Sequence, residues 1–159
     1  MTGKIAYLEI SGRQTGKTTR LVKIANDLIA QGETVIFVTP QAEDLHGRLP
    51  GVVVLSDRQA PPDEVDQEQA IWIYDEFDWL KSTKVRNGGY YATTANRVRD
   101  LRIDTPETDL LLQLIELNGG SYQRHLLTTG VIDEAYYEEA RAAYTDEQYR
   151  QLILGEFLK

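Results

Sequence analysis

The sequence predicts a three-layer α/β domain with a mostly parallel sheet, organised as a single unit over residues 1–159. Three observations predict this fold. Short apolar runs typical of buried strands alternate with stretches of helical periodicity. The first run leads through a glycine-lysine-threonine loop into a helix, and a later run ends in two adjacent acids, Asp75 and Glu76. Because ligands of parallel sheets bind where the strands end, we expect both features at one edge of the sheet.

The N-terminal half contains continuous apolar or β-branched runs, which predict buried parallel strands, and one long stretch of helical spacing that ends at Gly32. A polar, acidic loop over residues 56–69 is either a functional flap or a solvated connection. The expected strands are residues 4–10, 34–39, 52–55 and 70–74, and the expected helical segments are residues 18–31 and 41–49.

The C-terminal half is less regular. Residues 81–94 read as a loop, with Asn87-Gly88-Gly89 as a turn or hairpin tip. Thr105 and Pro106 predict a helix start, and Thr145 predicts another, with acids in its first turn. We expect helices at residues 77–80, 95–101 and 106–117, a strand at residues 125–129, and a helical segment over residues 133–159 that is broken near residues 144–146.

The composition is that of a globular protein with its own core, at 42% hydrophobic and 26% charged residues. The chain has no Cys, which excludes disulfides and thiolate metal sites, and its two His residues argue against a histidine metal site. No apolar run is long enough to span a membrane and no signal-peptide pattern begins the chain, so we expect a cytoplasmic protein without a membrane partner. The net charge of −8 argues against a domain that holds nucleic acid alone.

The loop Ser11-Gly12-Arg13-Gln14-Thr15-Gly16-Lys17-Thr18-Thr19 has the form of a phosphate-binding Walker A element. Its backbone N–H groups and the helix N-terminus would surround a phosphate. Lys17 would reach the β- and γ-phosphates of ATP, and Thr18 would ligate Mg²⁺. Gly16 allows a close approach of the backbone to the nucleotide. The first position of the usual pattern is Ser11 instead of glycine. The alternative is a βα turn that binds nothing.

The run Ile71-Trp72-Ile73-Tyr74-Asp75-Glu76 has the form of a Walker B element, an apolar strand that ends in two acids. Asp75 would support the Mg²⁺ shell, and Glu76 would polarise a water molecule beside the γ-phosphate. The second acid favours hydrolysis over phosphoryl transfer. The alternative is a helix N-terminus that favours acids.

Further residues could complete such a site. Thr128 and Thr129 end a strand expected beside the first strand, where a hydroxyl could sense the γ-phosphate and couple its loss to movement. Strand propensity of threonine is the alternative. Arg13 could contact the γ-phosphate in cis, or be a solvated loop residue. Four more arginines are candidates for a finger that reaches a neighbouring subunit, or are surface charges: Arg97, Arg99, Arg102 and Arg124.

Taken in order, these motifs resemble the ATPase motor domain of the viral large terminase family. The loop carries the Arg13-Gln14 pair often found there before Gly-Lys-Thr, and the strand ending in Asp75-Glu76 follows it. Leu126-Leu127-Thr128-Thr129-Gly130 is similar to the family's coupling motif. The most family-specific match is the segment 147–157, Glu-Gln-Tyr-Arg-Gln-Leu-Ile-Leu-Gly-Glu-Phe, which looks like the hand-over from the ATPase domain to a nuclease domain.

The resemblance implies a Mg²⁺-dependent ATPase of the additional-strand, catalytic-glutamate P-loop class, with Lys17, Glu76 and Arg13 as catalytic residues. It implies a DNA-packaging motor, or a non-packaging relative, that self-associates into a ring in the host cytoplasm. Expected partners are double-stranded DNA through an assembled complex, the viral portal, the small terminase or a separate nuclease subunit. No acidic nuclease cluster can be assigned, so we expect no DNA cleavage by this chain. Two alternatives stay open, a small nucleotide or metabolite kinase and a nucleotide-gated assembly factor with negligible hydrolysis.

Overall fold

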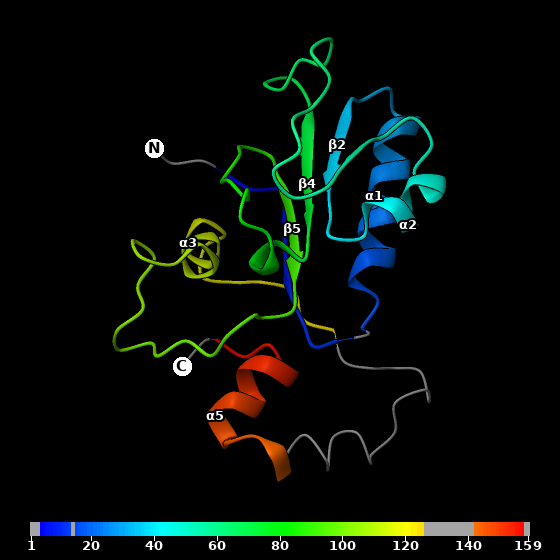
Figure 1. Cartoon of the computed structure of the whole chain (residues 1–159). Coiled ribbons are helices and arrows are strands. Elements are labelled where there is room, and N and C mark those ends of the chain that lie inside the picture. Colours follow the sequence, from blue (N-terminus) through cyan, green and yellow to red (C-terminus); the bar gives the residue numbers. More distant parts are fainter. Residues whose placement is uncertain (1–3, 14, 126–141, 158–159) are drawn as a thin grey trace.

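A sheet of five parallel strands forms the centre of the protein in a computed structural model that describes residues 4–13, 15–125 and 142–157. The strands lie in the order β1-β5-β4-β2-β3, so β5 is inserted between β1 and β4 (Figure 1). This arrangement confirms an α/β fold with a parallel sheet. The strands are β1 (Tyr7–Ile10), β2 (Val35–Val38), β3 (Val53–Leu55), β4 (Ile71–Asp75) and β5 (Tyr90–Thr93).

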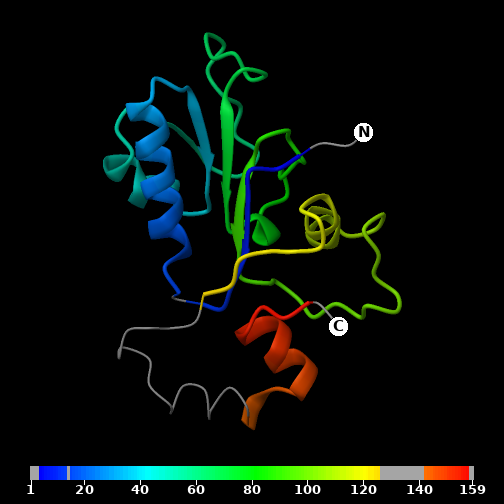
Figure 2. The same cartoon turned by 180° about the vertical axis from the view of Figure 1, so that it is seen from behind.

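Helices cover the sheet from both sides, which explains why its strands are continuously apolar. Helix α1 (Lys17–Ala30) packs Leu21 and Ala25 against Phe37 on one face. Helix α3 (Leu110–Leu117) lies on the opposite face, where its leucines join a cluster with Leu8 and Tyr91. Figure 2, seen from behind, shows α1 and α3 on opposite sides of the strands.

The remaining helical pieces are short. The helix α2 (Ala42–Leu45) and the 3₁₀ turn η1 (His46–Arg48) connect β2 to β3, and a second 3₁₀ turn, η2 (Phe77–Trp79), follows β4. Near the C-terminus, α5 (Asp146–Gln148) continues into a π-helical segment, η3 (Tyr149–Ile153). The side chains of Thr145 and Gln148 form a reciprocal capping box at the start of α5, which confirms the predicted helix start.

The C-terminal segment (residues 142–157) packs beneath the carboxyl ends of the strands, drawn in orange and red in Figure 1. The side chain of Gln151 is buried and forms two hydrogen bonds with the backbone of Arg99. Its Oε1 accepts a hydrogen bond from Arg99 N at 2.5 Å, and its Nε2 donates one to Arg99 O at 2.7 Å. A Cβ added at Gly12 would lie 2.1 Å from the carbonyl oxygen of Ile153. The loop after β1 and the C-terminal segment are therefore in direct backbone contact.

The prediction for residues 81–94 was wrong over its last part. Tyr90–Thr93 is the strand β5, in register with β1 through Tyr7 and with β4 through Ile73, and both pairings are parallel. The Asn-Gly-Gly turn before it is real, since Gly88 has a φ of 75°, but it leads into a parallel strand instead of closing a hairpin. The strand is only 4 residues long, which hid it among loop residues.

Three helix predictions after β4 were also wrong, in part or altogether. The helix expected over residues 106–117 begins at Leu110, because the carboxylate of Asp109 caps it by accepting a hydrogen bond from Leu112 N at 3.1 Å. Residues 95–101 form no helix. Residues 77–80 give a single 3₁₀ turn.

Candidate functional site

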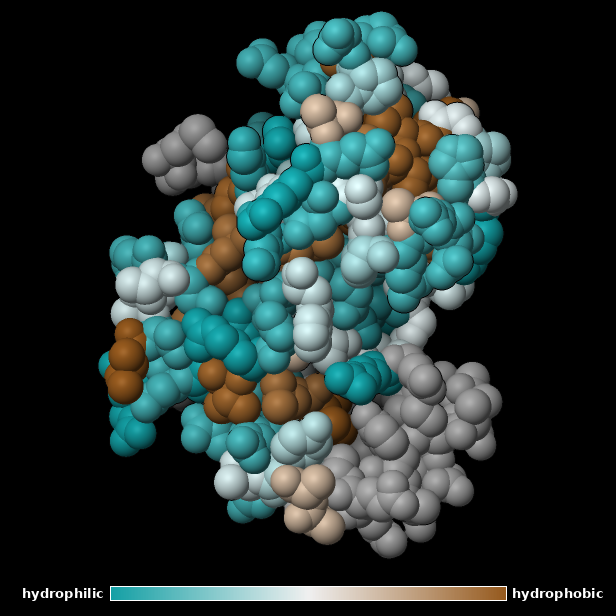
Figure 3. Space-filling model, viewed as in Figure 1, coloured by the Kyte–Doolittle hydropathy of each residue, from teal (hydrophilic) through white to brown (hydrophobic). Residues whose placement is uncertain are grey.

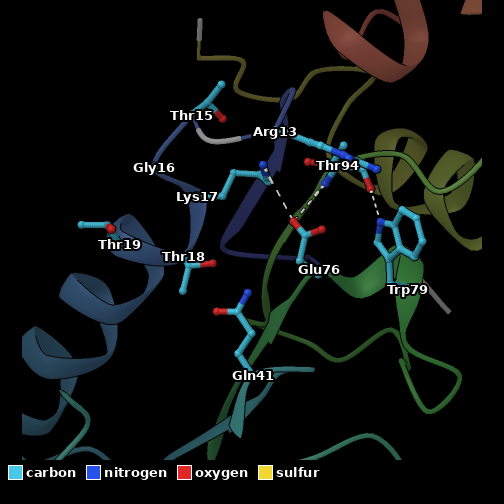
Figure 4. Close-up of a pocket in the computed structure, with 10 residues that line it drawn as sticks. All are labelled: Arg13, Thr15, Gly16, Lys17, Thr18, Thr19, Gln41, Glu76, Trp79 and Thr94. Carbon is cyan, nitrogen blue, oxygen red and sulfur yellow. Dashed lines mark hydrogen bonds and ion pairs between the residues drawn. The ribbon is translucent and has the colours of Figure 1, made fainter. Parts of the chain in front are cut away.

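The glycine-lysine-threonine loop, here called the GKT loop (residues 11–18, of which Gln14 lies outside the described residues), connects β1 to α1. Gly16 precedes the first helical residue with a φ of 86°, a left-handed conformation that favours glycine. The loop borders a cavity of about 490 Å³ at the carboxyl edge of the sheet (Figure 4). The residues that line this cavity are Arg13, Thr15, Gly16, Lys17, Thr18, Thr19, Gln41, Glu76, Trp79 and Thr94.

Lys17 lies across the inside of the GKT loop. Its Nζ donates a hydrogen bond to the carbonyl oxygen of Gly12 at 2.6 Å and lies 3.8 Å from the carboxylate of Glu76. Its side chain is only 6% exposed, and this burial lowers the pKa of Lys17 against the attraction of Glu76. The ammonium group therefore faces the cavity, where it can meet an anion.

Asp75 is fully buried at the end of β4 and connects three elements. It accepts hydrogen bonds from the hydroxyl of Thr18 at 3.0 and 3.2 Å and from the hydroxyl of Thr39 at 2.8 Å. Burial raises the pKa of Asp75, although the two hydroxyls and the positive charge of Lys17 oppose the shift. These oxygen atoms are of the kind that Mg²⁺ prefers.

Glu76 follows directly and has an unusual backbone. Its φ of 54° and ψ of 48° are left-handed, which is costly for a residue other than glycine and often marks a functional position. Its carboxylate accepts a hydrogen bond from Thr94 N at 3.2 Å. Burial raises the pKa of Glu76 to about 7, even though the positive charge of Lys17 opposes it. A carboxylate with a pKa near neutrality can accept a proton at physiological pH.

Thr94 and Trp79 were missed by the sequence analysis. Thr94 directly follows β5, and its carbonyl oxygen accepts a hydrogen bond from Trp79 Nε1 at 2.9 Å, while its N–H binds Glu76. The signal for Thr94 is the hydroxyl pair Thr93-Thr94 after the β-prone Tyr90-Tyr91. Thr128 and Thr129, expected at the end of a late strand beside β1, lie outside the described residues. Gln123, just before that expected strand, does form a parallel bridge with Glu9 of β1, and β5, which also pairs with β1, ends in Thr93.

Ser11 lies behind the cavity and does not line it. It is 1% exposed, and its hydroxyl donates to the carboxylate of Glu9 at 2.9 Å and accepts a hydrogen bond from His125 N at 2.9 Å. A glycine at this position could make neither bond. The serine therefore ties the GKT loop to its own strand and to the chain near residue 125.

The carboxylate of Glu9 is the centre of this buried group. It lies on β1 with no exposed surface and accepts two hydrogen bonds from the guanidinium of Arg20 on α1, besides one from the Tyr7 hydroxyl at 2.6 Å. Burial alone would raise the pKa of Glu9, but the hydrogen bonds from Arg20 and Tyr7 outweigh it and lower the pKa. The Glu9–Arg20 ion pair joins β1, just before the GKT loop, to α1, just after it.

Arg13 is the only candidate arginine among the described residues that lines the cavity, and it is exposed there. Arg99 is 2% exposed and forms ion pairs with Asp78 and Asp109. The other three candidates also have carboxylate partners within the chain: Arg97 with Asp104 and Asp109, Arg102 with Asp100, and Arg124 with Glu156.

Comparison with protein-family models, curated proteins and solved structures found no match to this chain. In the described part of the chain, no helix has the length and apolar character needed to cross a membrane.

Proposed function

We propose that this chain is a Mg²⁺-dependent ATPase of the P-loop class. The observation that carries the proposal is the hydrogen bond from Thr18, which lines the cavity together with Lys17 and Glu76, to the buried carboxylate of Asp75, which does not itself line the cavity. A lysine at the start of a helix, with a left-handed glycine before it, is suited to bind the β- and γ-phosphates of ATP. The cavity of about 490 Å³ is in the range of ligand sites.

The metal-binding part of the proposal depends on Thr18 and Asp75. The carboxylate of Asp75 has hydroxyl partners but no cation within hydrogen-bond distance among the described residues, although it is fully buried. A buried carboxylate of this kind favours a bound cation. Mg²⁺ takes one or two protein oxygens and completes its shell with water and phosphate, so the two side chains fit it. When bound, the ion would neutralise charge on the phosphates.

Hydrolysis is favoured over phosphoryl transfer by Glu76. Its carboxylate lies in the cavity near Lys17, and its pKa of about 7 allows it to orient and polarise a water molecule. The N–H of Thr94 holds this carboxylate from the end of β5, so Thr94 is suited to sense changes beside the γ-phosphate. The position of β5 between β1 and β4 agrees with the additional-strand class.

The further proposal of a terminase-like motor rests on the resemblance of the motifs. The contact between Gly12 and the C-terminal segment supports this motor proposal, because a movement of the GKT loop would displace the backbone that it touches in residues 142–157. In this proposal the chain self-associates into a ring, an arginine of a neighbouring copy completes the site, and double-stranded DNA is engaged by the assembly. Portal, small terminase and a separate nuclease subunit are the proposed partners.

Phosphate release from MgATP tests the proposal and separates it from the alternatives. We expect release in the absence of any acceptor, and an increase when double-stranded DNA and the assembled complex are present. A kinase would instead require a small-molecule acceptor, and a nucleotide-gated assembly factor would bind MgATP with no release under either condition. Either of those two results would reject the proposed activity.

A further inference from the structure

A second cavity, of about 170 Å³, lies on the face of the sheet opposite α1, away from the GKT loop. Its floor is formed by Trp72 and Tyr74 of β4 and Val38 of β2, and its walls come from the loops at residues 58–67 and 82–86. In Figure 1 the first of these loops crosses in front of β2 and β4. The same view in space-filling form shows mostly hydrophilic side chains over the middle of the molecule (Figure 3).

The lining of this cavity is basic. Arg58, Lys84 and Arg86 line it together with amide and hydroxyl side chains, and its lining includes no Asp or Glu. This is unusual in a chain of net charge −8. We call this cavity the basic pocket.

Most basic side chains elsewhere in the described residues are already paired. Six arginines form ion pairs: Arg20, Arg97, Arg99, Arg102, Arg124 and Arg150. The arginines for which the described residues provide no ion pair are Arg13, Arg48, Arg58 and Arg86. Of these, Arg13 lines the cavity at the GKT loop, and Arg58 and Arg86 line the basic pocket. Arg58 interacts electrostatically with the neighbouring carboxylate of Asp57 but forms no ion pair with it, so both cavities keep arginines whose charge a ligand could neutralise.

Arg86 is held in place before any ligand binds. Its guanidinium carbon lies 3.5 Å from the centre of the Trp72 ring, and its Nε donates a hydrogen bond to the Tyr74 hydroxyl at 2.8 Å. The Trp72 ring therefore covers a face of the guanidinium, and the Tyr74 hydroxyl binds its Nε. The two terminal nitrogens are the pair that binds an oxyanion in a bidentate manner.

The walls of the pocket are also fixed. The carboxylate of Asp57 accepts hydrogen bonds from Lys81 N and Ser82 N at 3.0 and 2.9 Å, and Arg58 N donates to the Ser82 hydroxyl at 3.1 Å. At the other end of the loop, Trp72 Nε1 donates to the carbonyl oxygen of Gln67 at 2.9 Å. The three cations are therefore attached to a built cavity instead of to free loops.

From this geometry we propose that the basic pocket binds a phosphate group through Arg58, Lys84 and Arg86. A cavity of about 170 Å³ admits one phosphate group but not a whole nucleotide. Three cations match the two negative charges of a phosphomonoester, and they also suit one phosphate of a nucleic-acid backbone. The site would allow a chain of net charge −8 to bind phosphate groups locally. It does not depend on nucleotide binding at the GKT loop.

The two tryptophans of the chain make the test direct, because each reports on one cavity. Trp72 forms the floor of the basic pocket, and Trp79 lines the cavity at the GKT loop. With ¹⁵N-labelled protein, the two indole N–H signals are assigned by the Trp79→Phe variant and followed during separate titrations with inorganic phosphate, short duplex DNA and MgATP.

We expect inorganic phosphate or duplex DNA to shift the Trp72 signal in a saturable manner. A response to both identifies a general phosphate site, a response to phosphate alone a free-phosphate site, and a response to duplex alone a nucleic-acid contact. The double variant Arg58→Ala, Lys84→Ala should weaken this binding about ten- to a hundredfold. The matched control Lys23→Ala, Arg48→Ala removes the same charge on the α1 side of the sheet, away from the basic pocket, and should leave the binding unchanged.

A Trp72 signal that neither phosphate nor duplex moves would overturn the inference, and so would equal binding by the double variant and its control. The ATPase proposal is tested separately by the Trp79 signal. If MgATP moves Trp79 while phosphate and duplex leave Trp72 unchanged, the inference fails and the proposed function stands. If MgATP leaves Trp79 unmoved while Trp72 responds, the proposed function fails and the basic pocket stands.

Discussion

The hydroxyl of Thr18 donates to both carboxylate oxygens of Asp75, at 3.0 and 3.2 Å, although the two residues lie 57 positions apart in the chain. The contact joins the first turn of α1, which follows β1, to the end of β4, and β5 lies between β1 and β4 in the sheet. It places a hydroxyl and a buried carboxylate together next to Lys17. This is the geometry on which the proposed metal and nucleotide site depends.

Replacement of Thr18 by Val should weaken Mg²⁺-dependent nucleotide binding at least about tenfold, because Val keeps the shape but removes the hydroxyl ligand. Thr18→Ser keeps the hydroxyl and should restore most of the affinity. The measurement is a titration with a fluorescent ATP analogue at several Mg²⁺ concentrations. Equal Mg²⁺ dependence in the Val and Ser variants would remove Thr18 from the site.

The value of kcat/KM for ATP should depend on pH through Glu76. Its pKa of about 7 means that the carboxylate is largely protonated below neutrality and cannot accept a proton from water. We expect kcat/KM to rise about tenfold per pH unit below pH 7 and to level off above it. If log kcat/KM varied by only about half a unit or less between pH 5.5 and 8, the profile would contradict this role.

The same pKa predicts an effect on stability. The folded pKa of about 7 lies above the ordinary value of 4.5, so the folded state binds more protons than the unfolded state between these values. The free energy of unfolding therefore falls as pH rises from 4.5 to 7. Glu76→Gln should remove this pH dependence. The change that the substitution causes in the free energy of unfolding should therefore be more favourable at pH 8 than at pH 4, by about 1–3 kcal/mol. The exposed Glu116→Gln is the control in denaturant unfolding, with no such difference expected.

Loss of the Glu9 charge should destabilise the protein and loosen the GKT loop. Glu9→Gln leaves Arg20 without its carboxylate partner, and breaking such a buried pair costs about 3–5 kcal/mol. Asp27→Asn removes the exposed partner of Lys23 on the same helix and should cost less than about 1 kcal/mol. Urea unfolding of both variants checks the comparison. Similar costs for the two would show that Glu9 has no special place in the fold.

Gly12→Ala should displace the C-terminal segment, because the added Cβ would lie 2.1 Å from the carbonyl oxygen of Ile153. We expect faster proteolytic cleavage within residues 142–157, while the sheet stays folded. Gly47→Ala introduces the same methyl group where no atom lies within 4 Å and serves as the control. Unchanged protection of the segment in Gly12→Ala would contradict the contact.

The sequence predicted the parts of the fold that have strong local signals. The β1–GKT loop–α1 unit and the strand that ends at Asp75 were correctly placed, because long apolar periodicity and a glycine before a lysine act over a few residues. Thr145 was also correctly predicted as a cap, since a capping box is local. The residues predicted from the sequence that line the cavity at the GKT loop, such as Lys17, Thr18 and Glu76, come from these segments.

The parts that were missed depend on tertiary contacts. The strand β5 is stabilised by pairing with β1 and β4 on both sides, and 4 residues carry too little periodicity to predict this. Thr94 was missed with it. Asp109 caps α3 in place of Thr105 because its carboxylate also receives the buried Arg99, a partner 10 residues away. The basic pocket brings Arg58 together with Lys84 and Arg86 from a second loop, and no linear motif marks it.

The most direct test of the central claim compares nucleotide binding with phosphate release in the wild-type chain and in Glu76→Gln, under conditions in which the wild type turns over. The variant keeps the size of the side chain and leaves Lys17, Thr18 and Asp75 in place. We predict that it binds MgATP at least as tightly as the wild type, while phosphate release falls by about two orders of magnitude or more. Normal turnover in the variant would contradict the assignment of Glu76, and with it the hydrolytic site proposed for this protein.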